Sequence, residues 1–190
     1  MLSWNANINL LFGALMENEV FRNNLICAII DLRNTVFSPQ RTDEFLQQIE
    51  NEWESVVIDY FLRFGPEEVA EMSEQEKRDY FSSMISRMQW FYEHRSWETI
   101  QILQEYTGKT MLEVNITGCE NKEITINGEE IYYEGSEWTG LYLPETEITL
   151  SVKDEKQFQG WYNDKDELLG KDYQYSFEIT KNVNIIAKFE

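Results

Sequence analysis

Apolar side chains in the first half of the chain recur every three to four positions, which is the spacing of one face of an α-helix. The stripes predicted in this way are Ile8, Leu11, Phe12, Leu15 and Met16; Phe21, Leu25, Ala28, Ile29 and Leu32; Phe45, Ile49, Trp53, Val56 and Tyr60; and Phe81, Met84, Ile85, Met88 and Tyr92. Ile26 and Ile30 widen the second stripe, so we expect that helix to be buried on most of its sides.

Capping residues divide these stripes into separate helices. A helix is expected to begin at Asn18, at Ser38 with Pro39, at Ser73 with Glu76, and at Ser96. A helix is expected to end at Gly65 with Pro66 and at Gly108. Residues 97–106 are thus predicted to form a short last helix, separate from the one before it.

From Met111 onward apolar and polar residues alternate, which is the pattern of half-buried strands. The alternating apolar residues are Leu112, Val114 and Ile116; Ile124 and Ile126; Ile148, Leu150 and Val152; Tyr173, Tyr175, Phe177 and Ile179; and Val183, Ile185, Ala187 and Phe189. The dipeptide Asn127-Gly128 is typical of a tight hairpin turn. About seven short strands favour a small antiparallel sandwich or barrel-like domain.

The change of spacing predicts an α+β chain of two domains, a helical one over residues 1–108 and a β domain over residues 111–190. Composition changes at the same place, because all seven arginines precede residue 96 and seven of the nine glycines lie from Gly108 onward. Hydrophobic residues make up 42% of the chain, which is typical of a globular protein that can bury a core.

The formal net charge of −19 disfavours nucleic acid and anionic membrane surfaces as partners, because both are negatively charged. The longest uninterrupted apolar run, Leu25 to Ile30, has six residues, whereas a helix needs about 20 to cross a bilayer. We therefore expect neither nucleic-acid binding nor membrane insertion.

Few residues could carry catalysis. His94 is the only histidine, and a cation near a helix C-terminus explains it without a catalytic triad. One histidine and two distant cysteines, Cys27 and Cys119, give no zinc-ligand spacing, and we expect Cys27 to be a buried thiol rather than part of a disulfide. The helical half has no glycine-rich phosphate loop. We assign no catalytic, cofactor-binding or metal-binding residue.

The 35 acidic residues are too many for the sequence to single out a pair for acid–base chemistry. Residues 163–170 partly match a calcium loop but lack its glycine and its closing glutamate, so we expect a solvated hairpin tip there. A carboxylate-dependent hydrolase stays open as a hypothesis. It would require two acids in a cleft, at least one of them with a raised pKa.

Aromatic residues of the β half offer another hypothesis, because their rings could stack on sugars. Most of them are expected in the core, since alternation places Tyr173 and Tyr175 on one face with Phe177. Trp138 and Tyr162 are the least easily assigned to the core, so they are the candidate ligand-binding aromatics.

Residues 10–50, LLFGALMENEVFRNNLICAIIDLRNTVFSPQRTDEFLQQIE, resemble the C-terminal helices of the spore-coat protein H (CotH) kinase-like family. The likeness extends over residues 8–106 and rests on Leu11, Leu15, Glu17, Asn18, Phe21, Arg22, Leu32, Asn34, Thr35, Phe37, Ser38 and Pro39. A second stretch, residues 158–190, is similar to the β-repeat modules of bacterial surface proteins of the Listeria–Bacteroides or internalin B-repeat sort. That likeness rests on Phe158, Gly160, Trp161, Tyr162, Phe177, Ile179, Thr180, Ala187 and Phe189.

The first resemblance implies an atypical protein kinase that phosphorylates spore-coat proteins with ATP and a divalent metal. The family's nucleotide and metal ligands lie upstream of the matched helices, so no position of this chain corresponds to them. The resemblance therefore implies a non-catalytic C-terminal part that supports a missing upstream kinase-like lobe, with Met1 as a truncation point. Its helices would then expose apolar surface that the lobe covers.

Both resemblances imply a secreted, cell-surface or spore-coat protein of a bacterium, with coat, envelope or extracellular proteins or glycans as further partners. The leading hypothesis is thus a structural support and interaction module without an activity of its own. The alternative is an extracellular glycan- or protein-binding module carried by the β domain.

Overall fold

The computed structural model describes residues 3–120, 122–132, 135–153 and 157–190, with side chains from Ile8 onward. The helices are α1 (Ser3–Glu17), α2 (Glu19–Asn34), α3 (Pro39–Phe64), α4 (Glu67–Ala70) and α5 (Glu74–Thr107). The strands are β1 (Leu112–Thr117), β2 (Ile124–Ile126), β3 (Glu129–Glu130), β4 (Glu137–Tyr142), β5 (Glu147–Val152), β6 (Phe158–Asn163), β7 (Leu168–Gly170), β8 (Gln174–Glu178) and β9 (Val183–Phe189). The predicted α+β class is confirmed, with helices first and strands after them.

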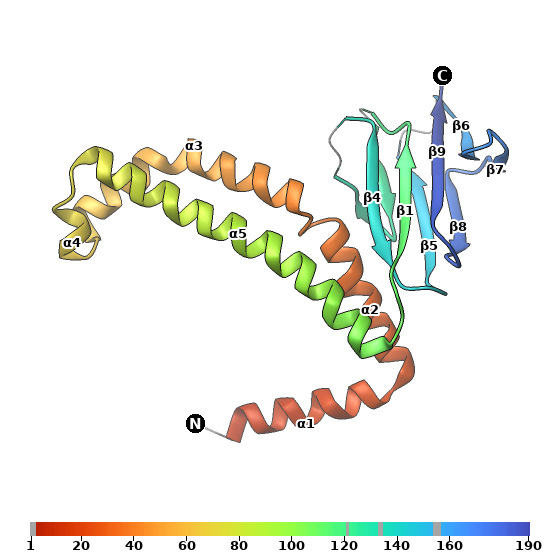
Figure 1. Ribbon diagram of the computed structural model, residues 1–190, viewed down its shortest axis with the longest axis horizontal. Helices are drawn as coiled ribbons and strands as arrows, with labels where there is room; N and C mark the ends of the chain where they lie inside the picture. The colour runs from red at the N-terminus through yellow and green to blue at the C-terminus, as the bar shows by residue number, and fades with distance from the viewer. Residues whose placement is uncertain (1–2, 121, 133–134, 154–156) are drawn as a thin grey trace.

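The helices α3 and α5 form a long antiparallel hairpin, the helical arm, which extends away from the β sandwich with α4 at its far end (Figure 1). Most predicted boundaries are confirmed. The side chain of Asn18 caps α2 by accepting a hydrogen bond from the backbone of Phe21, Pro39 is the first residue of α3, and Gly108 ends α5 with φ 66°. Helix α1 runs in a different direction from α2, and the chain bends where the two helices meet.

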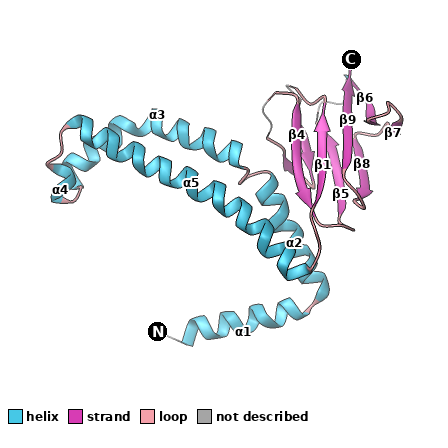
Figure 2. Cartoon of the chain, viewed as in Figure 1, coloured by secondary structure: helices cyan, strands magenta, loops and turns pink. Residues whose placement is uncertain are grey.

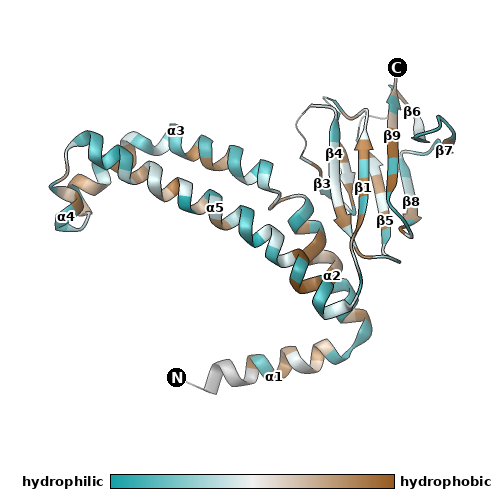
Figure 3. Ribbon diagram, viewed as in Figure 1, coloured by the Kyte–Doolittle hydropathy of each residue, from teal (hydrophilic) through white to brown (hydrophobic). Residues whose placement is uncertain are grey.

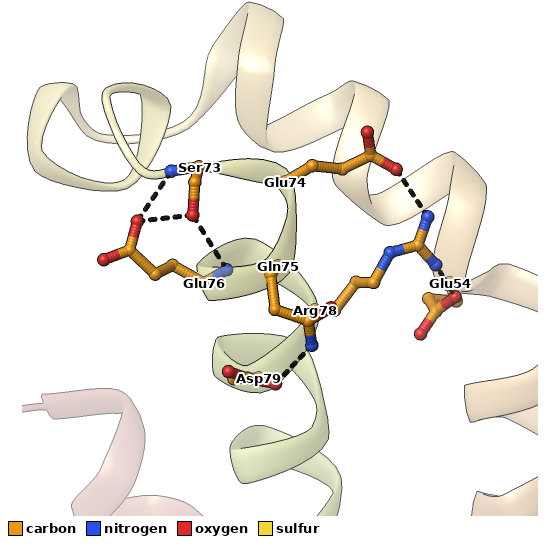
Figure 4. A network of polar contacts seen from close by, with 7 residues as sticks. All are labelled: Glu54, Ser73, Glu74, Gln75, Glu76, Arg78 and Asp79. Carbon is orange, nitrogen blue, oxygen red and sulfur yellow. Dashed lines mark hydrogen bonds and ion pairs between the residues drawn. The ribbon is translucent and has the colours of Figure 1, made fainter.

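Polar contacts hold the turn that joins α4 to α5 (Figure 4). Ser73 and Glu76 form the predicted capping box, in which each side chain bonds the backbone of the other residue. Arg78 then bridges the two long helices, because its guanidinium pairs with Glu74 of α5 and with Glu54 of α3. These contacts fix the register of the arm at its outer end.

The predicted break at Ser96 is wrong, because α5 runs without interruption from Glu74 to Thr107. Ser96 lies in its interior, and its hydroxyl caps nothing. His94 is consequently in the middle of the helix rather than near an end, with its Nδ1 2.8 Å from the carbonyl oxygen of Trp90. The segment contains neither glycine nor proline, so the backbone can continue as a helix where a serine alone is no reason to stop.

The strands build a sandwich of two sheets (Figure 2), which agrees with the sandwich prediction. One sheet has the order β4-β1-β9-β6-β7 and the other the order β3-β2-β5-β8. The predicted hairpin at Asn127-Gly128 is confirmed, with positive φ at both residues. The expectation of a purely antiparallel domain is wrong in one place, because β1 and β9 pair in parallel. This pairing joins the first and last strands of the domain.

One hydrophobic core continues from the sandwich into the base of the helices. Its helical part consists of Ile26 and Ile30 of α2 with Ile100 and Leu103 of α5, and Figure 3 shows apolar residues concentrated where these helices meet the strands. A second, smaller cluster joins α3 and α5 further out along the arm. It contains Leu46, Phe61, Val69, Phe81 and Ile85.

The expectation that α2 is buried on most sides is wrong. Its buried residues are Ile26, Ile30 and Asn34, all on one face, whereas Ala28 and Leu32 of the predicted stripe are exposed. The sandwich contacts the face formed by Ile26 and Ile30, the two residues that were expected only to widen the stripe. Part of the predicted stripe, including Ala28 and Leu32, is instead exposed on a surface beside the arm.

Candidate functional site

Large apolar side chains lie exposed along the helical arm. On α3 most of them belong to the predicted stripe, and on α5 one set recurs along a single flank of the helix. The exposed members of this stripe are Phe45, Trp53, Val56, Tyr60 and Phe64 of α3, and those of this flank include Tyr80, Met84, Met88 and Phe91 of α5. Exposed apolar surface of this extent on a helix normally marks a site that another polypeptide covers.

Four of these residues, Phe45, Trp53, Met88 and Phe91, line a groove, which we call the arm groove, made of three adjoining hollows. The first, of about 300 Å³, lies where α2 meets α5 and is lined by Ile29, Leu32, Arg33, Phe37, Phe91, Tyr92, Arg95, Ser96 and Thr99. The second, also about 300 Å³, is lined by Val36, Phe37, Arg41, Thr42, Phe45, Leu46, Ile49, Met88 and Tyr92. The third, about 370 Å³, is lined by Phe45, Gln48, Ile49, Glu52 and Trp53.

Shared residues make the three hollows continuous. Phe37 and Tyr92 line both the first and the second, and their rings are stacked with centroids 6.4 Å apart and planes 7° from parallel. Phe45 and Ile49 line both the second and the third. The groove therefore runs from the base of α2, across the turn before α3, and along α3.

The charge of the groove is opposite to that of the chain. Arg33, Arg41 and Arg95 line the first two hollows, and no carboxylate does. Burial lowers the pKa of Arg33 from its ordinary value, since removing a guanidinium from water disfavours its charged form. A chain of net charge −19 thus presents an apolar groove whose first two hollows are positively charged.

A polar latch joins α2 to the sandwich next to the groove. The side-chain amide of Asn34 donates to the carbonyl of Leu141 (2.8 Å) and accepts from the backbone N–H of the same residue (3.2 Å). Leu141 belongs to β4, an edge strand, so Asn34 occupies backbone groups that a further strand would otherwise bond. Asp31, one turn earlier, accepts from Tyr142 (3.0 Å) and from Asn127 (2.9 Å).

The carboxyl group of Asp31 gives the latch a dependence on pH. Burial raises its pKa above the ordinary 3.8, the hydrogen bonds from Asn127 and Tyr142 partly oppose the rise, and nearby Glu129 adds to it. The folded chain therefore binds a proton there more tightly than the unfolded chain does. Stability from this group is full at low pH and is lost as the pH rises through the folded-state pKa.

We accordingly expect Asp31→Asn to melt at a higher temperature than the wild type at pH 7, because an amide oxygen can accept both hydrogen bonds without a buried charge. The difference should shrink as the pH falls toward 3.8. Thermal unfolding across this pH range measures it, with Asp43→Asn on an exposed part of α3 as the control. A lower melting temperature for Asp31→Asn at pH 7 would contradict the expectation.

The two candidate ligand-binding aromatics lie in different environments. Trp138 of β4 is only 4% exposed and belongs to the main core, with its indole ring against Gly140. Tyr162 of β6 is half-buried, and the ammonium group of Lys188 lies over its ring, 4.3 Å from the centroid. The structure does not bring these two side chains into one site with the arm groove, which lies on the helices.

The other residues considered for chemistry lie apart from one another. His94 stacks on Trp90 on an exposed part of α5. Neither cysteine forms a disulfide, and Cys119 is buried whereas Cys27 is half-buried rather than buried as predicted. Burial raises the pKa of the Cys119 thiol to about 11, which keeps it protonated.

The acidic segment 163–170 contains the end of β6, the turn that follows it and strand β7. Asn163 accepts hydrogen bonds there from the backbone of Lys165 and of Glu167, and the tip is exposed, as predicted. Among the side chains described, no group of three or more histidine, cysteine, aspartate or glutamate residues is placed to hold a metal ion. No described helix combines the length and apolarity needed to cross a membrane.

Sequence reasoning missed the arginines of the groove and the role of Asn34. Arg33, Arg41 and Arg95 are spread over 63 positions, and nothing in their local patterns indicates that they line adjoining hollows of one groove. Asn34 did carry a signal, since it is a polar residue on the otherwise apolar face of Ile26 and Ile30. A buried amide on an apolar face requires partners, and here an edge strand supplies them.

Comparison with protein-family models, with curated proteins and with solved structures yields no match for this chain. The CotH kinase-like and β-repeat resemblances accordingly stay predictions. The groove and the latch are therefore interpreted from their own geometry.

Proposed function

We propose that this chain is a non-catalytic support and docking module, in which the arm groove packs against another polypeptide and the latch holds the sandwich at a fixed position beside it. The continuous apolar groove along α3 and α5 is the observation that supports the proposal most directly. Exposing an apolar face of this length to water is unfavourable, and covering it with a partner lowers the free energy.

The partner that fits best is a kinase-like lobe of the CotH kind, on the same polypeptide or a separate one. The residues that carry the CotH resemblance support this choice, because Phe37 lines the groove and Asn34 forms the latch. In this arrangement the ATP and metal chemistry belongs to the lobe. The sandwich would face outward, toward coat, envelope or extracellular partners at a bacterial surface.

The latch supports the second half of the proposal. A module that presents one domain while docking another needs a stiff connection between them. Asn34 and Asp31 supply four hydrogen bonds across the junction, and Ile26 and Ile30 add apolar contacts to the same core as the strands. The sandwich would thus move together with the helices when the arm docks.

We expect Phe45→Asp and Trp53→Asp each to weaken binding to a CotH kinase-like lobe by about tenfold or more, because each places an unpaired charge in the apolar contact of the groove. Both side chains are more than half exposed in the free chain, so their melting temperatures should stay close to that of the wild type. Calorimetric titration of the full chain with the purified lobe measures the affinity.

Gln47→Asp is the matched control, since it adds the same charge to α3 at an exposed position outside the groove. Binding lost equally in all three variants would indicate a general charge effect, and would count against docking through the groove. Saturable binding of ATP with magnesium or manganese to this chain alone would contradict the non-catalytic assignment.

A further inference from the structure

The first hollow of the arm groove contains polar atoms that the chain itself does not satisfy. The Oγ of Ser96 and the Nε of Arg33 are buried, and neither has a hydrogen-bond partner within the described parts of the chain. Ser96 is only 6% exposed and lines the hollow directly. Buried polar groups without partners are rare in folded proteins, and each one requires a structural or functional explanation.

Arg33 also has no counter-ion. The ion pairs formed among the described residues do not include it, although the chain has 35 acidic side chains. Within the part of the chain that the structure describes, its hydrogen bond goes from Nη1 to the neighbouring Asn34 (2.9 Å), a neutral amide already engaged with Leu141. A partly buried guanidinium is costly to leave unpaired, so a carboxylate that reached it would be bound strongly.

Arg95 stands on the opposite wall of the same hollow. Its ion pair with Glu98, at 3.3 Å, lies in a largely exposed position and is therefore weak. Arg95 is thus free to exchange Glu98 for a ligand. The two arginines belong to different helices, α2 and α5, so that a bound anion would lie between them.

We propose that the first hollow is a carboxylate-binding pocket, in which Arg33, Arg95 and Ser96 hold an acidic side chain of the polypeptide that occupies the arm groove. The proposal rests on the docking function proposed above and names the chemistry of the docked segment. Ile29, Leu32 and Phe91 form apolar walls around the polar groups. The segment that fits is therefore apolar on the contacting face, with one aspartate or glutamate directed at the two arginines.

Charge makes this pocket selective. The surface of a chain with net charge −19 repels acidic partners in general. An acidic residue is most favourable where its carboxylate reaches both Arg33 and Arg95. In another register the carboxylate would meet Arg41 alone in the second hollow, or Glu52 in the third. The pocket therefore sets the register of the docked segment.

The test uses the full chain and a small probe that carries both features of the expected ligand, namely hexanoate. Hexanoate is titrated into isotope-labelled protein at constant ionic strength, and the backbone amide shifts are followed by NMR. Saturable shifts are expected around residues 29–37 and 91–99, which line the hollow. Hexanamide, which has the same apolar chain without the charge, should bind about tenfold more weakly, as should hexanoate to the Arg33→Met and Arg95→Met variants.

Arg87→Met provides the matched control, because it removes an exposed arginine of α5 that does not line the groove. Its affinity for hexanoate should equal that of the wild type. Equal binding of hexanoate and hexanamide, unchanged affinity in both arginine variants, or the absence of a saturable shift at the hollow would each overturn the proposal. Since no lobe is present in this titration, its outcome is independent of whether a CotH kinase-like lobe binds the arm.

Discussion

Replacing Asn34 by alanine is expected to lower the free energy of unfolding by about 2–4 kcal/mol, because the N–H and carbonyl groups of Leu141 both lose their partner at a partly buried junction. Asn34 is 2% exposed, so water cannot simply take its place without rearrangement of the junction. Chemical denaturation followed by far-ultraviolet circular dichroism measures the change.

Asn24→Ala provides the control for this prediction, since it removes the same side chain from an exposed position of α2. Its effect should stay within about 0.5 kcal/mol. A loss below about 1 kcal/mol for Asn34→Ala would mean that the latch contributes little, and that the apolar contacts of Ile26 and Ile30 alone hold the helices to the sandwich.

Local signals in the sequence predicted the ends of most elements correctly. Caps and turns depend on a few neighbouring residues, so Asn18, the Ser73–Glu76 box and Asn127-Gly128 all act as their types predict. The predicted cap at Ser96 is the exception among these local signals. A serine competes for backbone bonds only where the helix is otherwise ready to end, and the surrounding residues continue it.

The buried faces of the helices were harder to predict, because periodicity identifies an apolar stripe without identifying what covers it. On α3 the predicted stripe is real, yet Trp53 and Val56 are exposed while Leu46 and Phe61 contact α5. The apolar arc of this helix is wider than the contact with its neighbour. Part of that excess width lines the arm groove, at Phe45 and Trp53, so the exposed side of the stripe coincides with the candidate site.

Pairings between distant segments could not be derived from either half alone. The parallel alignment of β1 with β9 joins strands about 70 positions apart, and local alternation carries no information on strand direction. The approach of Arg33 to Arg95 likewise depends on the crossing of α2 and α5. Composition records only that the arginines are confined to the first half.

The Asn-Thr-Val-Phe-Ser-Pro segment, residues 34–39, joins the two functional features. Asn34 forms the latch, Thr35 donates to the carbonyl of Asp31 (2.6 Å), and Phe37 stacks on Tyr92 to form a common wall of two hollows. Pro39 then starts α3. Six residues thus set the angle between helices, the shape of the groove and the contact with the sandwich, which explains why a short motif there could mark a whole architecture.

Trp138→Ala should cost about 3–5 kcal/mol of unfolding free energy, because it empties the space of an indole in the main core. The indole packs against Gly140, whose lack of a side chain makes room for the ring, so the neighbouring backbone is shaped to hold it. Tyr162→Ala should cost about 1 kcal/mol, since it removes a half-buried ring and its contact with Lys188. Thermal and chemical unfolding of the two variants measure the difference.

This pair of variants also tests the alternative of a glycan-binding β domain. If Tyr162 served a ligand, Tyr162→Ala would keep its fold and lose binding on a panel of surface glycans, whereas Trp138→Ala would lose both together. We expect neither the wild type nor Tyr162→Ala to bind the panel, because in the free chain the Tyr162 ring already lies beneath Lys188. Glycan binding abolished by Tyr162→Ala at an unchanged melting temperature would move the working surface of this protein from the arm to the sandwich.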